Sequence, residues 1–285
     1  MTCSATILIT ARDAASTIER AVRSACLQGD CSILLIDDFS SDETVLLAHA
    51  VAGRRLKVVR PPAHTTLGIA RQTGLTALDT PYGMWLDADD ELLPGRLESF
   101  IEAMEYSSAD IVTDGAELFD GPSGIFQAML PIPGFLIGRS PLARLFERNY
   151  LPVTGGIGFR TEFARKIGYD PTLNGAEDYD FLLRATAANA RYSLLASTGY
   201  RIYGYPQSLS RDIGNQRDMC SRALGKHRYE DVRDLYIQAG YDDRIAHWGL
   251  VSMAMYRKQY QAALEFLKRA EQLIADPDEV LEPDG

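Results

Sequence analysis

The sequence predicts an α/β protein whose first half is a parallel sheet, because short buried strands alternate with helices. Strands are expected at residues 5–10, 33–36 and 56–59, which are continuous apolar runs. Helices are expected after the Ser-x-x-Glu patterns of residues 16–19 and 40–43, which resemble capping boxes, and again over residues 67–78. This alternation is typical of βαβ units, whose ligands bind beyond the carboxyl ends of the strands.

A fourth buried strand, at residues 82–86, leads directly into an acidic stretch. Asp87 and Asp89 are two residues apart, so on an extended chain their carboxylates leave on the same side. Four carboxylates between residues 87 and 91 repel one another unless a cation lies among them. Oxygen ligands without a nearby His favour Mg²⁺, Mn²⁺ or Ca²⁺ over Zn²⁺. A solvated acidic turn that caps the helix after Pro94 is the alternative interpretation.

The second half of the chain changes rhythm. Short strands are expected at residues 111–113, 116–119, 125–129, 191–196 and 199–203, which makes the sheet mixed. A glycine cluster at residues 154–159 would let the backbone approach a ligand closely, and Glu177 and Asp178 open a helix. From residue 215 the chain is expected to be helical, with amphipathic helices near residues 245–255 and 260–274.

Composition sets limits on function. The 285 residues are 46% hydrophobic and 24% charged, enough for one large α/β domain with a small appendage. The formal net charge of −10 argues against a nucleic-acid partner. No apolar run is long enough to span a bilayer, and the first residues lead into a strand without a basic segment, so a cytoplasmic location is expected. The four scattered cysteines predict reduced thiols.

Six segments, in order, resemble the family 2 glycosyltransferases of the GT-A fold. They are residues 6–25, 33–44, 67–78, 82–98, 155–160 and 175–184. The resemblance implies a Rossmann-like βαβ nucleotide-binding half with a central mixed sheet, plus a C-terminal helical extension. The expected boundaries are residues 1–212 for the GT-A domain and 213–285 for the extension. Within the GT-A domain, residues 1–114 would bind the nucleotide-sugar and residues 115–212 the acceptor.

The resemblance also implies roles for individual residues. The base and ribose of the nucleotide-sugar would be held by Thr10, Ala11, Asp13 and Asp38. Arg71 would face the base or the phosphates, and Asp87 and Ala88 of the Asp-x-Asp motif would face the nucleotide. Asp89 would ligate Mn²⁺ or Mg²⁺. Asp178, beside Glu177, matches the catalytic base, and Gly155 and Gly156 are the candidate acceptor-binding residues. Tyr203 stands where many family members place a His near the metal.

The implied reaction is the inverting, metal-dependent transfer of a sugar from a nucleotide diphospho-sugar, with UDP as the default nucleotide, to an acceptor hydroxyl. One base without a second nucleophile implies inversion. The acceptor would be a glycan or a lipid-linked sugar in polysaccharide or glycoconjugate synthesis, reached by peripheral contact at the inner face of the membrane if it is lipid-linked.

Three alternatives remain. A catalytically degenerate nucleotide-binding or scaffold protein would act through its C-terminal helices, binding a protein partner or a second copy. A phosphatase of the haloacid-dehalogenase type and a receiver domain also use clustered aspartates, but they place them after the first strand.

Overall fold

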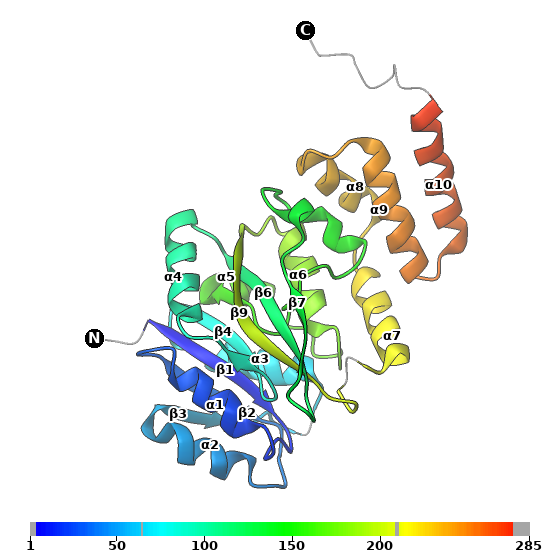
Figure 1. Cartoon of the computed structure of the whole chain (residues 1–285). Helices are drawn as coiled ribbons and strands as arrows, with labels where there is room; N and C mark the ends of the chain where they lie inside the picture. The colour runs from blue at the N-terminus through cyan, green and yellow to red at the C-terminus, as the bar shows by residue number, and fades with distance from the viewer. Residues whose placement is uncertain (1–3, 64, 209–210, 276–285) are drawn as a thin grey trace.

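The computed structural model describes residues 4–63, 65–208 and 211–275. Within these residues nine strands form one sheet: β1 (Ala5–Ala11), β2 (Ser32–Asp37), β3 (Leu56–Val59), β4 (Tyr82–Asp87), β5 (Glu91–Leu92), β6 (Ile111–Asp120), β7 (Phe126–Leu130), β8 (Gly158–Arg160) and β9 (Tyr192–Gly204). The strand order is β3-β2-β1-β4-β8-β6-β9-β5, with β7 paired to β6 (Figure 1).

Strands β1 to β4 pair in parallel, and β8 is antiparallel to both of its neighbours, β4 and β6. The predicted change from a parallel to a mixed sheet is therefore confirmed. Two predicted pairs of strands are each one continuous strand. The segments expected at 111–113 and 116–119 form β6, and those expected at 191–196 and 199–203 form β9. Register shifts beside Gly115 absorb the apparent breaks.

Ten α-helices surround or extend this sheet: α1 (Ile18–Cys26), α2 (Thr44–Ala52), α3 (Leu67–Ala77), α4 (Arg96–Ser107), α5 (Thr161–Ile167), α6 (Glu177–Ala187), α7 (Ile213–Leu224), α8 (Tyr229–Gln238), α9 (Asp243–Tyr256) and α10 (Tyr260–Ala275), all within the described residues. The capping boxes expected at Ser16 and Ser40 are wrong. The N-cap residues are Thr17 and Glu43, and neither makes a side-chain cap.

The core lies on both faces of the sheet because side chains alternate along each strand. Ile7 and Ile9 pack with α1 and α4 on one face, whereas Leu8 packs with α3 and α6 on the other. Trp85 of β4 is fully buried on the second face, against Phe159 and Tyr169. Burial on both faces explains why these strands read as continuous apolar runs.

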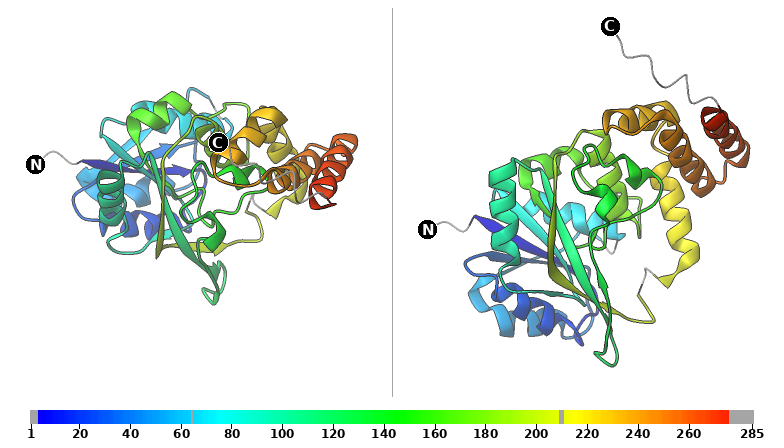
Figure 2. Two further views of the ribbon diagram at one scale, coloured as in Figure 1. Left: turned by 90° about the horizontal axis from the view of Figure 1, so that it is seen from above. Right: turned by 45° about the horizontal axis from the view of Figure 1, so that its top comes forward.

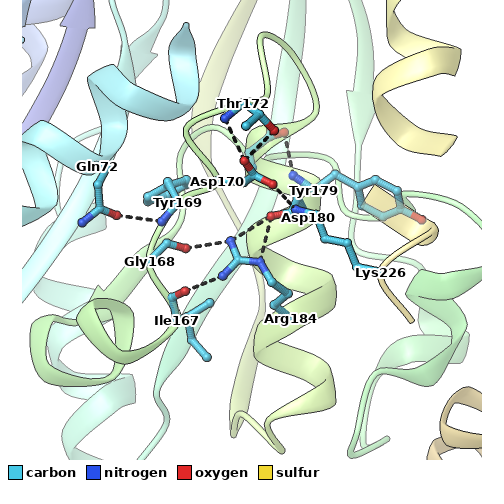
Figure 3. A network of polar contacts seen from close by, with 11 residues as sticks. Gln72, Ile167, Gly168, Tyr169, Asp170, Thr172, Tyr179, Asp180, Arg184 and Lys226 are labelled. Atoms are coloured by element: carbon cyan, nitrogen blue, oxygen red, sulfur yellow. Dashed lines mark hydrogen bonds and ion pairs between the residues drawn. The ribbon is translucent and has the colours of Figure 1, made fainter. Parts of the chain in front are cut away.

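The C-terminal helices extend from one side of the sheet domain, and α10 is farthest from it (Figures 1 and 2). Ion pairs and hydrogen bonds hold the C-terminal helices against the sheet domain. Lys226, just after α7, contacts Asp170 and Asp180 at 2.5 Å each, and Arg184 pairs with the other oxygen of Asp180 (Figure 3). Tyr236 of α8 donates to the buried Glu147 at 2.9 Å. The predicted domain boundary at residue 212 stays a prediction.

Candidate active site

A cavity of about 690 Å³ opens at the carboxyl ends of β1 and β4. These strands are adjacent and parallel, with Thr10 opposite Asp87, so the loops that follow them meet at one edge of the sheet. Nine of the predicted site residues line the cavity: Thr10, Ala11, Asp13, Arg71, Asp87, Ala88, Asp89, Glu177 and Asp178. Acids that are far apart in the sequence, from Asp13 to Asp178, therefore line one cavity.

Three predicted residues are not among those that line this cavity. Asp38 lies beside it, and its backbone N–H donates to the carbonyl of Ala11 at 2.9 Å. Gly155 and Gly156 lie beneath it. A Cβ on Gly155 would come within 2.4 Å of Asp87 Oδ2, and one on Gly156 within 2.4 Å of the Tyr200 ring. Gly155 therefore allows close packing against Asp87, and Gly156 against Tyr200, while their predicted role in binding an acceptor stays a prediction.

Arg71 of α3 joins the two ends of the cavity. Its side chain is 4% exposed, and it donates from Nη2 to Asp87 Oδ1 at 3.0 Å and from Nε to Glu177 Oε1 at 2.9 Å. Burial raises the pKa of Glu177, and the neighbouring Asp178 raises it further, although Arg71 opposes both effects. Arg71 and Glu177 therefore have structural partners that the sequence did not reveal.

Asp87 lies at the floor of the cavity, where 37% of its side chain is still exposed. Burial, together with the charges of Asp89 and Asp178, raises its pKa to about 7 in spite of Arg71. Burial also raises the pKa of Asp89, and it raises that of Asp90 well above the usual range. These raised pKa values result from burial and from an excess of negative charge at the carboxyl end of β4.

This excess is what a hard divalent cation would relieve, and the groups present are carboxylates, which suit Mn²⁺ or Mg²⁺. The residues therefore fit the predicted ion. In the described part of the chain, however, no three His, Cys, Asp or Glu side chains converge as a ready-made metal site. Asp89 as metal ligand stays a prediction.

Tyr203 forms part of the wall. The guanidinium of Arg20 lies 3.6 Å above its ring, its hydroxyl donates to Glu91 at 3.1 Å, and its backbone N–H donates to Asp90 at 2.9 Å. Arg20 in turn donates to the backbone carbonyl of Asp89. The aromatic residue thus braces the acidic loop from β9.

Asp13 connects two loops. Its Oδ1 accepts from the backbone N–H of Ser41 at 2.7 Å and from the Ser41 hydroxyl at 3.0 Å. These hydrogen bonds lower the pKa of Asp13. Asp37, the first acid of the Asp-Asp pair at the end of β2, is buried and paired with Arg60 at 2.8 Å. Asp13 therefore fixes the rim on which Thr10 and Ala11 lie.

Asp178 occupies the first turn of α6, opposite the acidic loop. Its Oδ2 accepts from the Thr154 hydroxyl, and its Oδ1 accepts from the backbone N–H of Tyr179 at 2.7 Å. Sequence reasoning did not assign roles to other residues of this wall: Asn149, Thr154, Gln216 and Cys220. The position of Thr154, directly before Gly155 and Gly156, could have indicated a site residue. No sequence pattern indicated that α7 packs against the cavity.

The parallel order β3-β2-β1-β4, with a cavity at the carboxyl ends of β1 and β4, is that of an open, Rossmann-like α/β fold. The structure resembles crystal structures of S. aureus TarS residues 1–349. One, in complex with UDP-GlcNAc, has a TM-score of 0.66 at 14% identity, covering 89% of this chain and 71% of the TarS 1–349 chain. This likeness confirms the predicted GT-A fold.

The chain belongs to glycosyl transferase family 2, whose model matches residues 6–168. The predicted family and glycosyltransferase class are therefore confirmed. The chain is 31% identical over 251 residues to the succinoglycan biosynthesis protein ExoU and 29% identical over 227 residues to ExoO, both of Rhizobium meliloti (strain 1021). These alignments cover 81% and 72% of this chain, but 66% and 62% of the two relatives. The described residues contain no helix with the length and apolarity to cross a bilayer.

Proposed function

We propose that this chain transfers a sugar from a UDP-sugar to a hydroxyl of a growing polysaccharide, with inversion at the anomeric carbon. The observation that carries the proposal is that Asp89, in the turn after β4, and Asp178 of α6 line one cavity. ExoU and ExoO are named for succinoglycan biosynthesis, and a further relative, 24% identical, for amylovoran biosynthesis in Erwinia amylovora. TarS is known in complex with UDP-GlcNAc and with UDP.

The bond changes balance with a single protein base. The acceptor oxygen forms a bond to the anomeric carbon, and the bond from that carbon to the diphosphate oxygen breaks. The bonding electron pair leaves with the diphosphate, and the acceptor's proton passes to Asp178. Because the acceptor attacks on the face opposite the leaving group, the configuration inverts.

The nucleotide end of the cavity is formed by Thr10, Ala11 and Asp13, with Asp38 beside it. Arg71 contributes here by holding Asp87, and it holds Glu177 beside the base through the same guanidinium. Asp89, with Asp87 nearby, would hold Mn²⁺ or Mg²⁺. Such a cation, when bound, neutralises the charge that builds on the departing diphosphate.

The acceptor end is the wall around Asp178. A glycan or a lipid-linked sugar would present its hydroxyl there, and a lipid-linked acceptor would require peripheral contact with the inner face of the membrane. The C-terminal helices are a candidate surface for a protein partner or for self-association.

Two measurements on the full chain test the proposal. UDP with Mn²⁺ should raise the melting temperature, because a ligand at a hundredfold excess over its Kd stabilises by about 2.7 kcal/mol. Donor hydrolysis, in which water replaces the acceptor, should release UDP from one of UDP-glucose, UDP-galactose or UDP-N-acetylglucosamine, and chelation by EDTA should abolish it. Asp178→Asn should lower that rate by roughly 10²- to 10⁴-fold while the UDP-induced thermal shift persists.

Two results would contradict this account. A chain that binds UDP but hydrolyses none of the three donors would be the degenerate nucleotide-binding protein. Hydrolysis by Asp178→Asn at the wild-type rate would remove Asp178 as the base.

A further inference from the structure

Both carboxylate oxygens of Asp178 accept a hydrogen bond from the protein. The Thr154 hydroxyl donates to Oδ2, and the backbone N–H of Tyr179 donates to Oδ1 at 2.7 Å. Two donors on two different oxygens fix the plane of the carboxylate. Each oxygen keeps a further lone pair for a proton that arrives from the cavity.

The direction of the Thr154 hydroxyl is also set. Its single proton goes to Asp178, so towards Asn149 it acts as an acceptor, and Asn149 Nδ2 lies 3.5 Å away. Asn149 Oδ1 accepts from the backbone N–H of Leu151 at 3.2 Å, which assigns the amide orientation. The donors therefore run one way, from Asn149 to Thr154 to Asp178.

The segment that carries Thr154 is held on both sides. The Thr113 hydroxyl donates to the carbonyl of Val153 at 3.1 Å, and Arg96 Nη1 donates to that of Gly156 at 2.8 Å. Arg96 is itself locked to Asp114 of β6 in a fully buried ion pair. Thr154 thus projects into the cavity from a backbone tied to the sheet, whereas Asp178 comes from α6.

We propose that Thr154 is a positioning residue, which holds the carboxylate of Asp178 in the orientation that receives the acceptor proton. This rests on the proposed function, since it takes Asp178 as the base. The N–H of Tyr179 holds only one carboxylate oxygen of Asp178 and the Thr154 hydroxyl holds the other, so the carboxylate plane is fixed only when both donate. Asn149 assists by orienting the hydroxyl.

The test compares Thr154→Val with Thr154→Ser in donor hydrolysis by the full chain, with UDP-glucose, UDP-galactose and UDP-N-acetylglucosamine and Mn²⁺. Valine keeps the shape of threonine and removes the donor, whereas serine keeps the donor. We expect Thr154→Val to lower kcat by about 10- to 100-fold and Thr154→Ser by less than about threefold, because misplacement of a catalytic group by 1 Å can cost about 100-fold. The donor KM and the thermal shift with UDP and Mn²⁺ should not change.

Thr172→Val is the matched control. The Thr172 hydroxyl donates to Asp170 Oδ1 at 2.7 Å, the same kind of bond in a neighbouring loop, but Thr172 is not among the residues that line the cavity. Its hydrolysis rate should equal that of the wild type. In an Asp178→Asn background, Thr154→Val should cause no further loss, because the two residues act as a unit.

The outcomes separate the two proposals. A wild-type chain that hydrolyses no donor refutes the proposed function and, with it, this inference. A wild-type chain that is active, with Thr154→Val equally active, refutes only the positioning role. A further loss of rate in the Asp178→Asn background would show that Thr154 acts elsewhere, and so would a loss in Thr154→Ser as large as in Thr154→Val.

Discussion

Replacement of Arg71 by methionine should be among the most damaging single changes outside the hydrophobic core. Methionine keeps much of the volume and the contact with Trp85, over whose ring the guanidinium lies at 4.8 Å. What it removes is the positive charge between Asp87 and Glu177. The Glu177 side chain is 4% exposed, so water cannot replace the lost partner.

The magnitude follows from this burial. Breaking a buried ion pair by removing one partner costs about 3–5 kcal/mol, because a charge is left without compensation. Since about 1 kcal/mol shifts the melting temperature of a chain of this size by about 2–4 °C, the expected loss is roughly 6–20 °C. The loss should shrink as the pH falls from 7 towards 5. The pKa of Glu177 is already raised by burial, and without Arg71 it rises further, so in that window the folded variant takes up protons that the unfolded chain does not.

The assay is urea unfolding of wild type and Arg71→Met at pH 7 and pH 5.5, followed by circular dichroism. Lys57→Met is the matched control. Lys57 pairs with Asp79 at 2.8 Å, but the two side chains are 63% and 64% exposed, so the pair should be worth about 1 kcal/mol or less. An Arg71→Met chain within about 1 kcal/mol of wild type at pH 7 would refute the reasoning, because no buried charge would then have lost its partner.

Three further changes probe other contacts. Gly155→Ala should weaken UDP–Mn²⁺ binding by at least about tenfold, because the added Cβ would lie 2.4 Å from Asp87 Oδ2 and displace that carboxylate. An unchanged affinity in calorimetry would contradict this prediction. Arg20→Met should raise the Mn²⁺ concentration needed for the UDP thermal shift, because the acidic loop loses the hydrogen bond from Arg20 to the Asp89 carbonyl. Arg23→Met, one turn further along the exposed face of α1, should leave that concentration unchanged. Equal Mn²⁺ requirements in the two variants would show that Arg20 does not support the loop. Burial lowers the pKa of His227 to about 4, so between pH 7 and pH 5 the unfolded chain binds a proton that the folded chain does not. The free energy of unfolding of the wild type should therefore fall by about 1–2 kcal/mol over this range, whereas that of His227→Phe should not. Parallel pH profiles of the two chains would show that His227 is not responsible.

Sequence patterns predicted the elements that are short, buried on both faces and bounded by turns. The strands that became β1 to β4 were placed within about two residues, because continuous apolar runs are typical of parallel strands covered by helices. The same patterns divided β6 and β9 into pieces. Small or polar residues such as Gly115 interrupt the apolar run, and only pairing with a neighbouring strand shows that the strand continues through a bulge.

The sequence by itself determined the kinds of groups at the site. Its motifs named acids at the ends of β2 and β4 and at the start of α6, and parallel βαβ order placed the first two at one edge. Tertiary structure alone decided which of these groups face the cavity and which are bound to one another. Arg71 bridges Asp87 to Glu177, Tyr203 braces the acidic loop, and Thr154 holds Asp178. These contacts join residues from 16 to 112 positions apart, and their distances depend on how helices pack on the sheet, which no local pattern records.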